Sequence, residues 1–69
     1  MDTVQKELEA RKSEIIKELE LLFKTNMKIT DWDVPETDDK EAAMIIANIL
    51  QEGLDKIKAD IEAGKYTNY

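Results

Sequence analysis

The sequence predicts an all-α fold, and three observations support that prediction. Residues with high helix propensity, chiefly Glu, Lys, Ile, Leu and Ala, dominate the composition. Only two glycines and one proline interrupt 69 residues, so a strand architecture would lack turn residues. Apolar residues recur every three or four positions, which is the spacing of one helix face. We therefore expect a single domain, residues 1–69, that folds as an antiparallel two-helix hairpin and dimerises into a four-helix bundle.

The first helix is expected over residues 2–28. The segment Asp2-Thr3-Val4-Gln5 has the form of a capping box, in which the cap side chain and Gln5 satisfy free amides of the first turn. An apolar stripe follows with helical spacing and is flanked by a shoulder of Ile16, Phe23 and Met27. The stripe consists of Val4, Leu8, Ile15, Leu19 and Leu22.

A loop is expected over residues 29–37. Pro35 lacks an amide proton and biases Val34 toward extended geometry, which disfavours helix at this point. The loop is unusually rich in large apolar residues, because it contains Ile29, Trp32 and Val34. These three side chains can fold back over the end of the helix pair.

The second helix is expected over residues 38–63, followed by a flexible tail, residues 64–69. Asp38-Asp39-Lys40-Glu41 forms another capping box and places negative charge at the positive end of the helix dipole. Gly64 is positioned to adopt the left-handed conformation that ends many helices.

An antiparallel hairpin aligns the two apolar stripes in one register. Gly53 then falls beside the poorly apolar Arg11-Lys12 step, which makes it a point of close helix approach. The expected facing pairs are Val4 with Ile61, Leu8 with Ile57, Ile15 with Leu50, Leu19 with Ile46, and Leu22 with Ala43.

The second helix is apolar around too much of its circumference to be covered by one partner helix. With Ile46 facing the first helix, Ile45 lies to one side and Met44 nearly opposite, at 100° per residue. We expect Ile16, Phe23, Met44 and Ile45 to mediate self-association. A homodimer is the first expectation, and a higher oligomer or a foreign partner are the alternatives.

Composition excludes several functional classes. The chain has neither cysteine nor histidine, so disulfides, thiolate zinc sites, imidazole ligands and Ser-His or Cys-His catalysis are ruled out. We expect no enzyme activity, no cofactor and no metal site. The longest apolar run, Ala42 to Ala47, is far shorter than the roughly 20 residues that span a bilayer. A cytoplasmic protein without membrane contact is therefore expected.

Acidic residues are concentrated in one short segment. The net charge is −6, and residues 29–41 hold six acidic side chains against one basic, whereas the flanking segments are nearly balanced. Nucleic acid is not expected to bind such a chain, because binding to phosphates requires clustered Lys and Arg. The segment also departs from the EF-hand calcium loop, since Pro35, Glu36 and Ala42 stand where that loop needs a ligand, a glycine and a bidentate Glu.

We interpret the acidic segment as a binding site for a protein partner with a basic surface. An aromatic residue with an acidic rim is typical of an interaction hot spot. For Trp32 itself, a lid that covers Met27, Ile29 and the helix ends is favoured over a partner contact, because a small protein with one tryptophan rarely leaves it out of the core. The residues assigned to partner binding are Asp31, Trp32, Asp33, Val34, Glu36, Asp38 and Asp39.

Two short motifs resemble those of known families. Glu36-x-x-Asp39 with Glu52-x-x-Asp55 is similar to the paired acidic motif of MazG-type pyrophosphohydrolases, which implies magnesium and a triphosphate. Here, however, the first pair straddles a loop and a helix cap. Leu50-Gln51-Glu52-Gly53-Leu54 resembles a motif of phage hairpin proteins that sequester cyclic nucleotides, but the arginine expected downstream is missing.

The expected function is that of a small non-enzymatic regulatory or adaptor protein that binds its partner through the acidic, aromatic interhelical turn. The alternative is a ligand- or RNA-binding oligomer, such as a phage-type nucleotide sponge or an RNA binder like the plasmid protein Rop. Lys6, Lys17, Lys24 and Lys28 would have to converge across the dimer to form such an RNA-binding face.

Overall fold

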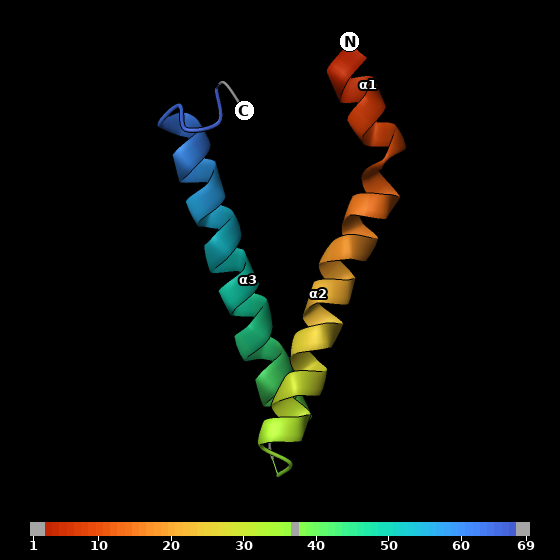
Figure 1. Ribbon diagram of the computed structural model, residues 1–69, viewed down its shortest axis with the longest axis vertical. Coiled ribbons are helices and arrows are strands. Elements are labelled where there is room, and N and C mark those ends of the chain that lie inside the picture. The colour runs from red at the N-terminus through yellow and green to blue at the C-terminus, as the bar shows by residue number, and fades with distance from the viewer. Residues whose placement is uncertain (1–2, 37, 68–69) are drawn as a thin grey trace.

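The computed structural model describes residues 3–36 and 38–67, and in these ranges the chain is entirely helical and loop. Three helices follow one another: α1 (Thr3–Ala10), α2 (Lys12–Asp33) and α3 (Asp39–Glu62). Figure 1 shows a V in which α1 and α2 form one arm, α3 forms the other, and the turn between them forms the apex. The predicted all-α class is confirmed.

The first arm consists of two helices, whereas a single helix over residues 2–28 was expected. Arg11 separates α1 from α2, with φ −100° and ψ 5°. Its amide donates to the Leu8 carbonyl at 3.1 Å, so the chain makes one tight turn here before Ile15 donates to the Arg11 carbonyl at 3.0 Å. No glycine or proline stands nearby, and nothing in the local sequence explains the break. The expected cap at Asp2 lies outside the described residues.

The helix α2 continues to Asp33, so the expected loop over residues 29–37 is wrong for its first five residues. The physical reason is the short range of the proline effect, because Pro35 restricts only the residue before it. That residue, Val34, leaves the helical region with φ −134° and ψ 80°. Its amide still donates to the Thr30 carbonyl at 2.8 Å, which closes the last turn of α2.

Both ends of α3 lie at the signals in the sequence. The Asp38 carboxylate accepts from the Lys40 amide at 2.9 Å and caps the first turn. Gly64 adopts φ 84° and donates to the Ile61 carbonyl at 3.0 Å, while Lys65 donates to the Asp60 carbonyl at 3.0 Å. This pair of bonds is the Schellman motif, which satisfies the last carbonyls of a helix.

The two arms pack against each other near the apex. Ala42 is the one buried residue among those described, with 4% of its surface exposed. Its small side chain and that of Ala43 allow α3 to approach α2 closely, because no bulky group separates the two backbones. The half-buried residues around this contact are Phe23, Asn26, Met27 and Thr30 of α2, with Ala43, Ile46 and Leu50 of α3.

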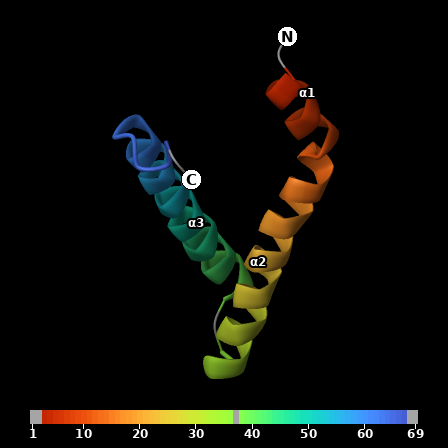
Figure 2. The same cartoon turned by 45° about the horizontal axis from the view of Figure 1, so that its top comes forward.

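Away from the apex the arms diverge. Figures 1 and 2 show from two directions that α1 and the C-terminal half of α3 lie apart, and these two helices make no close contact in the described chain. The expected pairs of Val4 with Ile61 and of Leu8 with Ile57 are therefore not formed within one chain. These four side chains are between 46% and 65% exposed.

The open shape leaves a large surface in contact with water. The chain exposes 6407 Å², whereas a compact protein of its mass exposes roughly 4,500 Å². The radius of gyration is 15.9 Å, against about 11 Å for a compact domain of this length. A single chain thus leaves roughly 2,000 Å² uncovered relative to a compact fold.

The Asp38 cap gives a first prediction. Replacing Asp38→Ala removes the acceptor for the Lys40 amide and should lower the free energy of unfolding by about 1 kcal/mol, as cap losses do elsewhere. Urea unfolding followed by circular dichroism measures this change. Asp38→Asn is the matched control, because the amide oxygen can still accept the bond. Equal destabilisation by both variants would contradict the capping role.

Candidate functional site

A groove lies at the apex between the end of α2, the turn and the first turns of α3. We call it the apex groove, and its volume is about 500 Å³. Three elements close in sequence build it, so its shape depends mainly on the turn and on the packing of Ala42 against α2. Its lining residues are Thr30, Val34, Glu36, Asp38, Glu41, Ala42, Ile45 and Ile46.

The apex groove combines apolar and acidic side chains. Val34, Ile45 and Ile46 supply apolar surface, and Val34 and Ile45 are about half exposed. Glu36, Asp38 and Glu41 supply three carboxylates. Such a groove suits a long cationic side chain, whose methylenes can cover the apolar part while its head meets the carboxylates.

Asp31 and Asp39 form a separate carboxyl pair that connects α2 to α3. A hydrogen bond that protonated Asp31 donates to the Asp39 carboxylate raises the pKa of Asp31 above that of an ordinary aspartate, and partial desolvation and the charge of Asp39 act in the same direction. A hydrogen bond between two carboxyl groups needs one proton. The apex is therefore held together better when the pair is protonated.

Trp32 lies on the outer side of the first arm and is 86% exposed. It follows Phe23 by nine residues, or about two and a half helical turns, which places it opposite the face that packs on α3. The interpretation of Trp32 as a lid over Met27 and Ile29 is wrong for the single chain. Ile29 is also exposed, at 53%.

The structure divides the predicted partner-binding residues into three places. Val34, Glu36 and Asp38 line the apex groove, and Asp31 and Asp39 form the carboxyl pair. Trp32 and Asp33 line neither. Sequence reasoning missed four further lining residues, although the spacing of Glu41 and Ile45 by one helical turn was a usable signal. The missed residues are Thr30, Glu41, Ala42 and Ile46.

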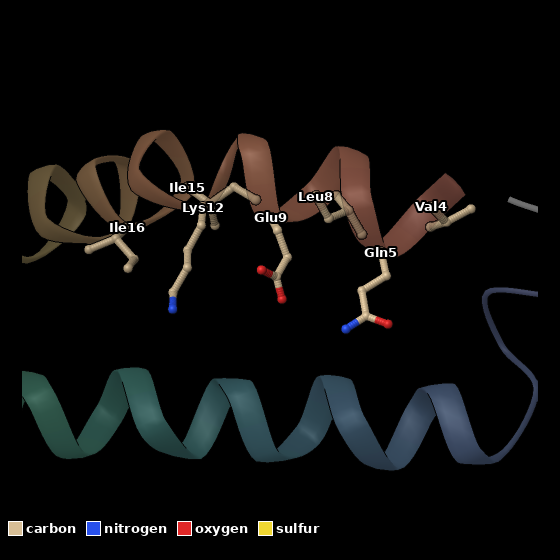
Figure 3. A pocket seen from close by; sticks show the side chains of 7 residues that line it. All are labelled: Val4, Gln5, Leu8, Glu9, Lys12, Ile15 and Ile16. Carbon is tan, nitrogen blue, oxygen red and sulfur yellow. The ribbon is translucent and has the colours of Figure 1, made fainter. Parts of the chain in front are cut away.

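A second groove, the arm groove, runs along α1 and the start of α2 and has a volume of about 550 Å³. Figure 3 shows the side chains of Gln5, Glu9 and Lys12 reaching from this arm toward α3. Their apolar neighbours make the groove a surface suited to another helix. Its lining residues are Val4, Gln5, Leu8, Glu9, Lys12, Ile15 and Ile16.

The four residues predicted for self-association do not share one surface of the single chain. Ile16 lies in the arm groove, Ile45 lies in the apex groove, and Phe23 is half-buried beside α3. Met44 is 57% exposed.

An ion-pair cluster supports the last turn of α3. The Asp60 carboxylate lies 2.9 Å from Lys56 Nζ and 3.6 Å from Lys65 Nζ. The hydrogen bond from Lys56 lowers the pKa of Asp60, and the same bond raises the pKa of Lys56. All three groups belong to one helix end, so the cluster reads as local support of that end.

In residues 3–36 and 38–67 no three carboxylates are grouped so that they could hold a metal ion. None of the described helices has the length and apolar character needed to cross a bilayer. Comparisons with family models, curated proteins and solved structures find no match.

The carboxyl pair predicts a pH dependence. Because folding raises the pKa of Asp31, its contribution to stability is complete below the ordinary aspartate pKa and is lost as the pH rises through the raised value. Asp31→Asn keeps a donor to Asp39 without the second charge. It should raise the melting temperature at neutral pH and remove part of the decline between acid and neutral pH.

Thermal unfolding followed by circular dichroism across that pH range measures the effect. Asp33→Asn, which makes the same charge change two residues away, is the control and should leave the pH profile unchanged. A neutral-pH melting temperature that is lower for Asp31→Asn than for the unmodified chain would refute the assignment.

Proposed function

We propose that this protein is a small non-enzymatic adaptor that binds a basic surface of a protein partner through its apex. The observation that carries the proposal is the apex groove, which is lined by both apolar and acidic side chains. We assign its place of action to the cytoplasm. The partner's contribution is a lysine or arginine side chain that enters the groove.

Charge distribution supports the choice of a basic partner. Residues 29–41 hold six acidic side chains and one basic one, so the apex is the most negative part of the chain. An oppositely charged surface is attracted over about one Debye length, roughly 8–10 Å at physiological salt. Such attraction raises the association rate and selects against acidic partners.

Trp32 provides a second contact point on the outer side of the apex. Exposed tryptophan is rare on surfaces without a binding role, and tryptophan is enriched among residues that dominate interface energies. A partner that reaches around the apex would meet the groove on one side of α2 and Trp32 on the other. This arrangement replaces the single acidic and aromatic surface expected from the sequence.

We also propose that two chains form a homodimeric four-helix bundle. The roughly 2,000 Å² that each chain leaves uncovered relative to a compact fold is of the size that obligate homodimers bury, about 1,000–2,500 Å² per chain. Ile16 and Met44 are each about half exposed and would be covered in such a dimer, whereas Ile45 lines the apex groove and would stay accessible. The apex can remain open when the arms associate, because the residues that line its groove belong to the end of α2, the turn and the start of α3, which form the closed end of the V (Figure 1).

Neutralising the groove should weaken partner binding. Glu36→Gln with Glu41→Gln removes two carboxylates and leaves the Asp38 cap in place. A partner captured by cross-linking in the host, identified and purified, should bind this variant about tenfold more weakly at low salt, and the difference should shrink as salt rises. Fluorescence of Trp32, the one tryptophan in the chain, reports binding.

Glu18→Gln with Glu20→Gln is the matched control, because it makes the same charge change on α2 away from the apex. It should leave the affinity within about twofold, as distant surface charges do. Equal affinities and equal salt dependence for the groove variant and the control would refute the proposed function.

RNA binding is the second candidate, and the spacing of three lysines favours it. Lys17, Lys24 and Lys28 are separated by seven and four residues, so they lie within about 40° of one another on α2. Lys6 belongs to α1, beyond the break at Arg11. A salt-dependent gel shift of an RNA hairpin, lost in the triple lysine-to-glutamine variant, would support this function. The absence of any shift at low salt would exclude it.

A further inference from the structure

Gly53 occupies the middle of the apolar face of α3. It lies seven residues after Ile46 and four before Ile57, and both intervals return to the same side of a helix. Glycine lowers helix stability relative to alanine at such a position. A Cβ atom built on Gly53 would have nothing within 4 Å, so no contact within the chain requires a glycine there.

The break at Arg11 is the second irregularity without a local cause. The register that pairs Leu8 with Ile57 and Ile15 with Leu50 places Lys12, the first residue of α2, opposite Gly53. Figure 3 shows the Lys12 side chain reaching from its helix toward α3. In this register Gly53 and the break at Arg11 therefore lie opposite each other, although α1 and α3 diverge in the single chain (Figure 1).

We propose that a second copy of this chain lies across each arm groove, with Gly53 of one copy against the α1–α2 junction of the other. This arrangement rests on the homodimer of the proposed function and specifies how its two chains pack. Each α3 packs along the α1 and α2 of the other chain. The missing side chain at Gly53 allows the two backbones to approach where the first arm changes direction.

The area left uncovered favours a second copy as the occupant. The area that one chain exposes in excess of a compact fold equals the area that each chain buries in a homodimer interface. A two-fold axis would cover this area on both chains, because the arm groove of each copy would bind the α3 of the other. Chemistry is complementary too. The arm groove presents Val4, Leu8 and Ile15, while α3 presents Ile57 and Ile61, and these side chains are between 44% and 65% exposed.

Disulfide trapping distinguishes this arrangement from a dimer of closed hairpins. The chain has no cysteine, so a Leu8→Cys chain mixed with an Ile57→Cys chain can form only engineered disulfides. Oxidation of the mixture should give the heterodisulfide as the main product. Lys6→Cys, at the same level but on the other side of α1, replaces Leu8→Cys in the control mixture and should give several-fold less.

The Leu8→Cys, Ile57→Cys double variant completes the test. Disulfides between chains support the arrangement, and disulfides confined to single chains, or none in either experiment, overturn it. Native mass spectrometry of the unmodified chain distinguishes a failure of the arrangement from a failure of the dimer itself. A dimer that gives only intrachain disulfides refutes the packing of each α3 on the first arm of the other chain. A monomer at all concentrations refutes the proposed dimer. Binding at the apex is measured independently.

Gly53→Ala is expected to have opposite effects in an uncovered helix and in the proposed dimer. In an uncovered helix, alanine should raise helix stability, because its Cβ meets nothing. In the proposed arrangement, it should weaken dimerisation about tenfold or more, as measured by sedimentation equilibrium, because the added methyl separates the two backbones. Ala47→Gly, elsewhere on α3, is the control for propensity. Dimerisation unchanged or strengthened by Gly53→Ala would overturn the close approach.

Discussion

The fold is governed by a shortage of core. A chain this short buries too little apolar surface to offset the conformational entropy of its own ordering, and without cysteine it has no covalent staple. Ala42 is the one buried side chain among the described residues, and seven half-buried neighbours surround it. The arms, the exposed apolar stripes and the two grooves all follow from this constraint, because surfaces that find no cover inside the chain remain available outside it.

The sequence predicted best where a local chemical signal acts directly on the backbone. Asp38 caps α3 because its carboxylate reaches an amide two residues on, and Gly64 ends α3 because glycine adopts a positive φ without strain. Both effects need only neighbours in the chain. The break at Arg11 has no such signal, since the residues around it are good helix formers.

The candidate site was predicted only in part, because the end of the helix that precedes the turn was placed too early. Ending the first helix at Lys28 made Trp32 a loop residue, free to turn inward with Val34. Once α2 is extended to Asp33, helical geometry places Trp32 opposite Phe23 and therefore outside. Glu41 and Ile45 are one helical turn apart on α3, so the sequence places them side by side, but the groove that they line also depends on how α3 packs against α2, which no local pattern specifies.

The short turn at the apex also determines the order in which the chain gains structure. Phe23 and Ala42 are nineteen positions apart, so bringing them together closes a small loop, whereas Val4 and Ile61 are separated by most of the chain. Closure of short loops and formation of helices are complete within about microseconds, and association of subunits takes milliseconds or longer. Contact at the apex is therefore the fast step and is independent of concentration. Covering of the arms is the slower step, and it supplies the apolar burial that the apex alone lacks.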